Sequence, residues 1–215
     1  MNSITRHYRT DSTTGLDPSI IAYLDSVIRD KLAYFDTPNP KVVVVFSGGN
    51  GVGKTTLATR ISHELHGLLI ENDAIKRALI AHDPTLDKDQ RNVMTWQYTM
   101  HLYAQLPRHT SNGLVVRDGV IDWYFDRILP LFTEQGYRLF IIGYNLSREK
   151  RAELITQRGD TPTTTAQRLL DIMEEHEPHV ARFRAQYAPT ISIDETNLFD
   201  HDRVIATLTR FLKES

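Results

Sequence analysis

The stretch VVVVFSGGNGVGKTT, residues 42–56, joins a run of β-branched residues to a glycine-rich turn that ends in Lys-Thr-Thr. Within it, residues 48–55 match the pattern G-x-x-x-x-G-K-[ST] at every fixed position. Glycines allow the backbone to turn its N–H groups inward, and the N-terminus of a following helix adds partial positive charge. The stretch therefore predicts a strand, a phosphate-binding loop and a helix, and with them a site for a nucleoside triphosphate.

Individual residues of this loop have distinct expected roles. Lys54 is expected to reach the β- and γ-phosphates as a point charge, while Thr55 offers its hydroxyl to Mg²⁺. The residues predicted to contact the nucleotide are Gly48, Gly49, Asn50, Gly51, Val52, Gly53, Lys54, Thr55 and Thr56. A turn without a ligand is the alternative. The lysine, the threonine and both flanking elements favour binding of ATP with Mg²⁺.

The overall composition narrows the class of protein. The 215 residues, 40% of them apolar, are enough for one domain with a single core. The formal net charge of −2 gives no general attraction to nucleic acid or to an anionic membrane. The chain has no cysteine, which excludes disulfides, a thiolate zinc site and a cysteine nucleophile. Because no segment approaches the about 20 apolar residues of a membrane span, we expect a cytoplasmic protein without membrane contact.

The chain divides into three parts. Residues 1–15 are expected to be a flexible N-terminal tail. Residues 16–40 comprise an amphipathic helix, which begins at Asp17-Pro18, and a proline-containing linker. The apolar face of this helix either packs on the main core or docks a partner. Residues 41–215 form the main domain.

Short apolar strands alternate with helices in the main domain. The strands are expected at residues 41–46, 68–70, 114–117, 137–144 and 190–193. The helices between and after them are expected at residues 54–66, 74–81, 89–106, 121–135 and 202–212. This alternation predicts an α/β fold with a parallel sheet that is covered on both faces. The charged residues 147–188 predict two helices around a turn, as in a mobile lid.

Carboxylates follow the second and third strands. Asp73 lies after the second strand, at the edge of a parallel sheet where ligands bind, and is a candidate general base for an acceptor hydroxyl. Its alternative role is to cap a helix that starts at residue 74. Lys76 and Arg77 are expected to hold an anionic substrate. Asp118 is expected to bind Mg²⁺ or substrate, the alternative being a turn residue before glycine.

Further candidates lie in the acceptor pocket and in the lid. Asp122 and Trp123 are candidates for the lining of the acceptor pocket, although core packing explains Trp123 equally well. Arg158 and Arg168 are expected to approach the phosphates when the lid closes, the alternative being solvated side chains. His176 and His179 are interpreted as surface residues, because Pro178 is expected to disrupt their helix and no third metal ligand lies nearby.

The sequence lacks the signatures of two other classes of nucleotide-binding protein. There is no N-K-x-D motif of the kind that guanine-specific switches use to read the base, and no second signature of the LSGGQ kind that transporter ATPases carry. A small kinase needs a phosphate loop, an acceptor carboxylate, an acid that supports Mg²⁺ and a cationic lid. The chain offers a candidate for each.

Three segments resemble the P-loop small-molecule kinases, a broad group that contains adenylate and guanylate kinases, polynucleotide 5′-kinases and zeta-toxin-like kinases. They are the phosphate loop, the D-x-x-[KR] pattern at residues 73–76, and AELITQRGDTPTTTAQRL at residues 152–169. The resemblance covers residues 41–215. It implies a P-loop NTPase three-layer sandwich, with a five-stranded parallel sheet of order 2-3-1-4-5 and a helical lid.

The resemblance also implies roles for particular residues. ATP is the implied donor, Asp73 the implied base, Asp118 lies near the metal, and the two arginines of the guanylate kinase lid match Arg158 and Arg168. In the polynucleotide-kinase-like branch an arginine stands where this chain has Lys76, so bidentate geometry is lost. The β-rich acceptor insert of guanylate kinase has no counterpart in the helical residues 74–107, and GMP kinase activity is not predicted.

The leading hypothesis is an ATP- and Mg²⁺-dependent kinase that phosphorylates a hydroxyl or phosphate of a small molecule. One alternative is a nucleotide-dependent binding or regulatory ATPase that docks partners through its N-terminal helix. The other is a polynucleotide 5′-kinase, which the acidic overall balance disfavours.

Overall fold

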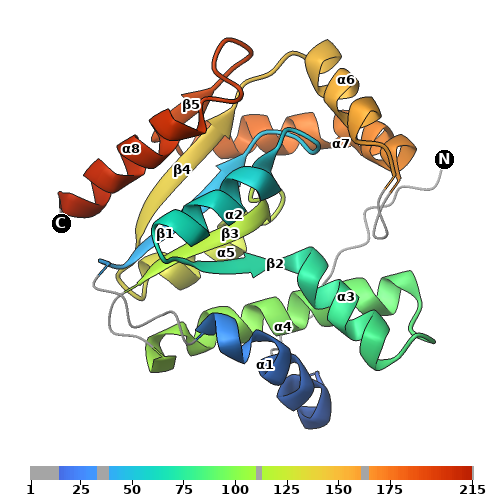
Figure 1. Cartoon of the computed structure of the whole chain (residues 1–215). Helices are drawn as coiled ribbons and strands as arrows, with labels where there is room; N and C mark the ends of the chain where they lie inside the picture. Colours follow the sequence, from blue (N-terminus) through green and yellow to red (C-terminus); the bar gives the residue numbers. More distant parts are fainter. Residues whose placement is uncertain (1–14, 33–38, 110–112, 161–164, 215) are drawn as a thin grey trace.

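The computed structural model describes residues 15–32, 39–109, 113–160 and 165–214 (Figure 1). At its centre is a five-stranded sheet whose order is β2-β3-β1-β4-β5, and every paired strand is parallel to its neighbour. The strands are β1 (Val42–Ser47), β2 (Leu68–Glu71), β3 (Leu114–Val120), β4 (Arg138–Tyr144) and β5 (Ile191–Ile193). The expected fold class and strand order are confirmed.

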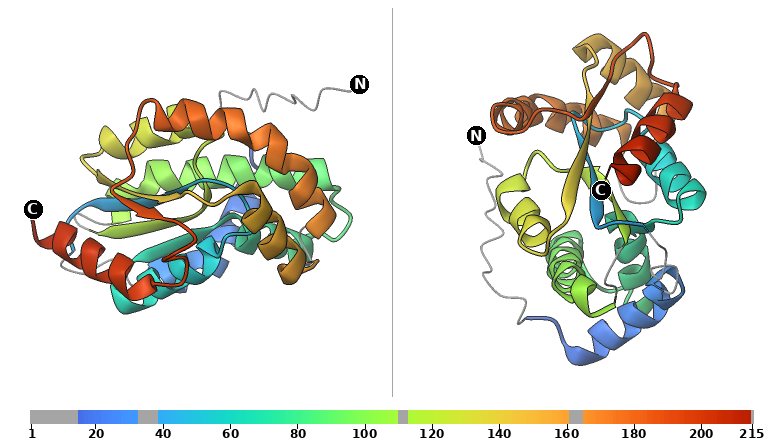
Figure 2. Two further views of the ribbon diagram at one scale, coloured as in Figure 1. Left: turned by 90° about the horizontal axis from the view of Figure 1, so that it is seen from above. Right: turned by 90° about the vertical axis from the view of Figure 1, so that its left-hand side faces the viewer.

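Helices cover both faces of the sheet. They are α1 (Pro18–Leu32), α2 (Lys54–Glu64), α3 (Asn72–His82), α4 (Lys88–His109), α5 (Phe125–Thr133), α6 (Arg148–Arg158), α7 (Ala166–Arg184) and α8 (His201–Lys213). The right-hand view of Figure 2 shows α4 and α5 on one side of the strands, and α2 and α8 on the other. This is the three-layer arrangement.

Strand β1 explains why two cores form. Val43 and Val45 join the core under α1, α3, α4 and α5, whereas Val42, Val44 and Phe46 join the core under α2 and α8. All five side chains are fully buried. Successive residues of a strand point to opposite faces, so a strand that is buried on both sides has to be apolar throughout.

The N-terminal helix α1 packs on the first of these cores. Leu24 is fully buried in this core, and Ile20, Ile21 and Tyr23 pack against the core from its edge. The Tyr23 ring also stacks on His82 of α3, with ring centroids 4.5 Å apart. Of the two roles considered for this helix, α1 thus takes the packing role. The expected tail and most of the expected linker lie outside the described residues.

Several element boundaries differ from the sequence-based expectation. Helix α2 ends at Glu64, because Leu65 leaves helical geometry and His66 adopts a φ of 52°. Helix α3 begins at Asn72, two residues early, and α5 begins only at Phe125. Strand β3 extends beyond Arg117, so Asp118 lies inside it and pairs in register with Glu71. Among the helices that the described residues form, none combines the length and apolar character needed to cross a bilayer.

Helices α6 and α7 form the expected helical pair beside the phosphate loop (Figure 1). They share a small core of their own, made of Ile155, Leu169 and Met173. The expectation that Pro178 disrupts its helix is wrong, because α7 continues through it to Arg184. Pro178 is exposed, so water can satisfy the helix carbonyl that proline leaves without a donor.

Candidate active site

The phosphate loop, residues 48–55, lies tightly between β4 and α6, and its glycines are structurally required. Gly48 has a φ of +95°, and a Cβ there would lie 2.3 Å from the Tyr144 carbonyl oxygen. Gly51 has a φ of +78°, and a Cβ there would lie 2.4 Å from Cγ1 of Ile155 on α6. Both positions exclude a side chain for steric reasons as well as conformational ones. The lid helix α6 therefore rests directly on the loop.

Lys54 is the first residue of α2 and is only 7% exposed. Its Nζ donates a hydrogen bond to the Gly49 carbonyl, which holds the ammonium group inside the loop. Burial lowers the pKa of Lys54 to about 8, against the opposing influence of the Asp118 and Asp122 carboxylates. An ammonium group that is held out of water in this way gains strongly from an anionic ligand.

Asp118 faces the start of α2 from the end of β3. Burial raises the pKa of Asp118, although a hydrogen bond from the Thr55 hydroxyl and the charge of Lys54 act in the opposite direction. The Asp118 carboxylate and the Thr55 hydroxyl are oxygen ligands of the type that Mg²⁺ prefers. In the described ranges no three His, Asp or Glu side chains form a metal-binding group. The pair therefore suits a Mg²⁺ ion that would take its other ligands from outside the chain.

Asp73 lies in the first turn of α3 and lines the same cavity. The Lys76 ammonium, one turn further along the helix, is 3.7 Å from its Oδ1. The alternative role of Asp73 as the helix cap is wrong, because Glu71 occupies the cap position and α3 starts at Asn72. Asp73 thus lines the cavity beside a cation.

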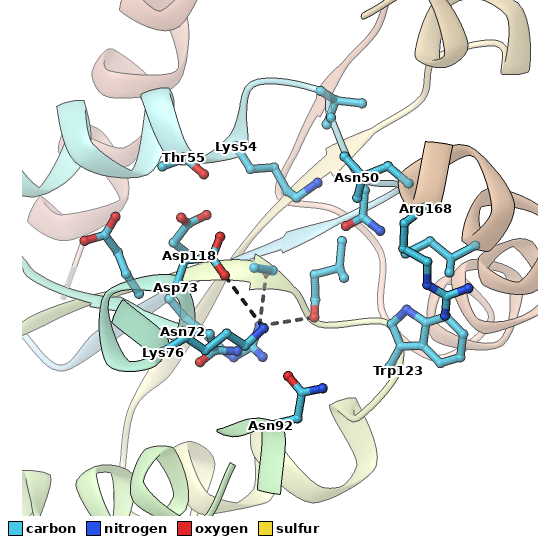
Figure 3. A pocket seen from close by; sticks show the side chains of 18 of the residues that line it. Asn50, Lys54, Thr55, Asn72, Asp73, Lys76, Asn92, Asp118, Trp123 and Arg168 are labelled. Carbon is cyan, nitrogen blue, oxygen red and sulfur yellow. Dashed lines mark hydrogen bonds and ion pairs between the residues drawn. The ribbon is translucent and has the colours of Figure 1, made fainter. Parts of the chain in front are cut away.

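One cavity of about 1130 Å³ contains most of the predicted site residues. Its walls come from the phosphate loop, α3, α4, the end of β3 and the two lid helices (Figure 3). The basic residues in its lining are Lys54, Lys76, Arg77, Lys88, Arg91, Arg117, Arg158 and Arg168. The acidic residues are Glu71, Asp73 and Asp118. The lining is therefore strongly cationic, although the whole chain has a net charge of −2.

Both predicted lid arginines line this cavity. Arg158 ends α6, and its charge helps to lower the pKa of Lys54 after the effect of burial. Arg168 lies in the first turn of α7, where its backbone N–H donates to the capping hydroxyl of Thr165. An ion pair from Arg151 to Glu177 joins the two helices. The helical pair thus presents both guanidinium groups to the cavity as one unit.

Asp122 does not line the cavity, which differs from its expected place in the acceptor pocket. It is fully buried beneath the phosphate loop. Its Oδ1 accepts a hydrogen bond of 2.7 Å from Ser47 Oγ, and its Oδ2 accepts one of 2.9 Å from the Gly48 N–H. Burial by itself would raise the pKa of Asp122, but the bonds from His176, Gly48 and Ser47 lower it below the ordinary value. Asp122 therefore holds the start of the loop.

The interpretation of His176 as a surface residue is wrong. His176 is 1% exposed, and its Nε2 lies 3.2 Å from Oδ2 of the buried Asp122. Trp123 stacks on this ring with an interplanar angle of 1°, and it also packs on His179 at a centroid distance of 3.9 Å. Through His176, the lid helix α7 is connected to the carboxylate that holds the phosphate loop.

Several residues of the site were not predicted from the sequence, among them Arg117, Trp96 and His176. Arg117 and Trp96 line the cavity, and His176 contacts Asp122. An arginine inside the apolar strand LVVRDG was a signal that could have identified Arg117. Trp96 and His176 carry no such signal, because their places depend on how α4 and α7 pack.

A G-x-x-x-x-G-K-[ST] loop between β1 and α2, in a sheet of order 2-3-1-4-5, defines a P-loop NTPase with a kinase-like fold. The chain belongs to the family described as "AAA domain", whose sequence profile matches residues 43–179. A search of curated proteins finds no match to this chain.

Several solved structures share the fold. A protein of Chloroflexus aurantiacus, whose kinase assignment is itself provisional, is 17% identical, with 83% of this chain and 99% of that chain covered and a TM-score of 0.57. A chain from the PezAT toxin-antitoxin system of Streptococcus pneumoniae is 13% identical, covers 86% and 81%, and has a TM-score of 0.56. The tunicamycin resistance protein of Deinococcus radiodurans is 16% identical, covers 80% and 95%, and has a TM-score of 0.52. At these identities the similarity establishes the fold alone.

Proposed function

We propose that this protein is an ATP- and Mg²⁺-dependent kinase that transfers a phosphoryl group to a hydroxyl or phosphate of a small molecule in the cytoplasm. One observation carries the proposal: a single cavity brings together the phosphate loop, the carboxylates Asp73 and Asp118, and the lid arginines. The kinase assignment of the Chloroflexus protein, which shares the fold, supports it.

The donor half of the cavity would be built around Lys54. The loop amides and Lys54 would hold the phosphates of ATP, with Thr56 and Arg168 as further contacts, and Thr55 and Asp118 would hold the metal. When bound, ATP with Mg²⁺ supplies an activated phosphoryl group. The buried Lys54 ammonium and the guanidinium groups of the lid would stabilise the charge that develops on that group during transfer.

The acceptor half would be built around Asp73. The acceptor oxygen forms a bond to the γ-phosphorus, the bond from that phosphorus to the bridging oxygen of ADP breaks, and the acceptor proton passes to the Asp73 carboxylate. Lys76 and Arg77 would orient the acceptor. Arg158 would approach the transferred group from the lid, which also excludes water.

Phosphotransfer to a library of small molecules, followed by mass spectrometry, tests the proposal. We expect one class of acceptor to gain a phosphoryl group, and Asp73→Asn to lower kcat by at least about 100-fold without weakening ATP binding. Glu134→Gln, an exposed change beyond the cavity, is the matched control and should leave turnover unchanged. Undiminished turnover of the true acceptor by Asp73→Asn would remove Asp73 from the reaction.

The same screen addresses the alternative functions. An oligonucleotide with a 5′-hydroxyl is included, and its phosphorylation would replace the small-molecule assignment by a polynucleotide kinase. The absence of transfer to every acceptor would contradict the kinase proposal. Docking of a partner through α1 is not favoured by the packing, because Leu24 of that helix is buried in the core.

A further inference from the structure

We propose that the acceptor carries an anionic group, a phosphate or a carboxylate, which binds a subsite anchored by the buried guanidinium of Arg117. The inference rests on the proposed function, because it names the acceptor class of the same cavity. Arg117, which sequence reasoning did not select, is the central residue of this subsite.

Successive side chains of β3 point to opposite faces of the sheet, and this separates the two halves of the site. Asp118 points toward Thr55 at the start of α2, on the donor side. Val115 points to the opposite face, into the core under α4 and α5. Since residues two apart share a face of a strand, Arg117 lies on the side of Val115, away from the metal pair. The cationic group and the Asp118 carboxylate thus serve different parts of the cavity.

Arg117 is costly to bury. It is only 3% exposed, yet it lines the cavity. Its Nη1 donates to the carbonyls of Gly119 at 3.1 Å and Val120 at 3.2 Å. The buried Tyr103 hydroxyl also lies beside the Arg117 guanidinium. In the described part of the chain the Arg117 Nε has no hydrogen-bond partner, and none of the ion pairs found there includes Arg117. A buried cation whose partners are only neutral carbonyl and hydroxyl groups is stabilised by an anion.

Further basic residues surround the same half of the cavity. Lys76 and Arg77 come from α3, and Lys88 and Arg91 come from α4. In the proposed function the phosphates of ATP are bound by Lys54 and the lid arginines. These four side chains and Arg117 are therefore positive charge beyond what the donor needs. Of these, Lys76 lies 3.7 Å from the Asp73 carboxylate. A cavity with an excess of positive charge, in a chain of negative net charge, concentrates anionic ligands.

Aromatic side chains supply the apolar part of this subsite. Trp96 of α4 and Tyr124 pack together with ring centroids 4.7 Å apart, and both line the cavity. Trp123 lines it as well. The chain contains only two tryptophans, and both are in this lining. Intrinsic tryptophan fluorescence therefore reports on ligand binding at this site without a label.

The test uses binding rather than turnover. The donor half is first filled with Mg²⁺ and AMP-PNP, a non-hydrolysable ATP analogue, and tryptophan quenching then follows phenyl phosphate, benzoate and the neutral benzyl alcohol. We expect at least one of the two anions to bind at least about tenfold more tightly than benzyl alcohol, and its affinity to fall as salt is added. Equal affinity of the neutral compound, or no measurable binding of either anion, would overturn the proposal.

Variants identify the anchoring residue. Arg117→Met should weaken the anion by at least about tenfold, and Arg117→Lys should weaken it less, because the charge remains while the planar geometry is lost. Arg210→Met, at an exposed position on α8, is the control and should change nothing. If Arg117→Met does not fold, the exposed pair Arg77→Gln and Lys88→Gln replaces it, with an expected loss of about threefold or more. Anion binding unchanged in every variant that folds would refute the subsite.

The outcome is separable from that of the kinase proposal. Phosphotransfer to a neutral acceptor would leave the kinase proposal standing and overturn the anionic subsite. Anion binding that depends on Arg117, without transfer to any acceptor, would support the subsite and overturn the kinase proposal.

Discussion

Replacing Asp122 tests whether one buried carboxylate organises both the phosphate loop and the lid helix. In Asp122→Ala, Ser47 Oγ, the Gly48 N–H and the His176 ring lose a shared acceptor in a region where Ser47, Asp122 and His176 are at most 1% exposed. A buried donor that is left without an acceptor costs about 1–3 kcal/mol, and because at least two donors lose their acceptor, we expect a loss of about 3–5 kcal/mol in the free energy of unfolding.

Asp122→Asn should cost much less. The Gly48 N–H donates to Oδ2, and the His176 Nε2 lies 3.2 Å from the same oxygen, while the Ser47 hydroxyl donates to Oδ1. An asparagine can therefore place its carbonyl oxygen at the Oδ2 position and donate from its amide to the Ser47 hydroxyl, which also accepts. The charge and the acceptor of the Ser47 O–H are lost, which we expect to cost about 1–2 kcal/mol at neutral pH.

The pH dependence of this difference has a definite sign. The hydrogen bonds hold the pKa of Asp122 below its ordinary value in the folded protein. Such a carboxylate contributes stability above the unfolded pKa of about 3.9, and that contribution is lost as the pH falls through the folded value. The stability gap between the wild type and Asp122→Asn should therefore narrow in acid.

Denaturant unfolding, followed by tryptophan fluorescence and far-ultraviolet circular dichroism, measures these changes. Asp126→Ala is the matched control, since it breaks a 2.6 Å ion pair with Arg182 of α7 in which both side chains are 50% exposed. That variant should lose no more than about 1 kcal/mol. A loss below about 1 kcal/mol for Asp122→Ala, or equal losses for the alanine and asparagine variants, would refute the reasoning.

Three further predictions concern the phosphate loop. Burial lowers the pKa of Lys54 to about 8, so the free energy of unfolding of the nucleotide-free protein should rise by up to about 3 kcal/mol between pH 8 and pH 10.5. Lys54→Met should abolish this rise. If denaturant unfolding showed the same pH dependence in both proteins, the assignment would be contradicted. Gly51→Ala places a Cβ 2.4 Å from Cγ1 of Ile155 at a backbone φ of +78°. Thermal unfolding should show a loss of stability of about 1–3 kcal/mol, and an unchanged unfolding temperature would show that the loop adapts to the side chain. Thr55→Val removes the hydroxyl that donates a hydrogen bond to Asp118. Calorimetric titration should then show that added Mg²⁺ no longer tightens ATP binding. If Mg²⁺ tightened ATP binding in the variant as it does in the wild type, the metal role of Thr55 would be refuted.

The local part of the site was predictable because its signals are contiguous. The glycines, the lysine and the threonines of residues 48–56 act through neighbouring backbone groups, so their spacing alone defines the loop. The parallel sheet followed from apolar strands that alternate with helices. Asp73 and Asp118 were found because the ends of parallel strands meet at one edge. Their chemical roles stay predictions.

Errors occurred where a residue's environment depends on distant parts of the chain. His176 was interpreted as a surface residue, because nothing near it shows that α7 brings it to Asp122. The hydrogen bond from Ser47 to Asp122 spans 75 positions, so neither residue contains a local sign of the other. The helix around Pro178 was also misjudged, because solvent exposure, which sequence does not show, makes the missing donor tolerable.

Sequence by itself determined the phosphate-binding loop and the layered α/β architecture of this protein, because backbone geometry and hydrophobic periodicity are written in adjacent residues. Only the tertiary structure decided that Asp122 lies under the loop, that His176 connects it to α7, and that the buried Arg117 lines the cavity. Whether a charged side chain is buried, and beside which partner, depends on contacts between segments that are far apart in the chain. Burial and the nearest charges decide what such a side chain can do.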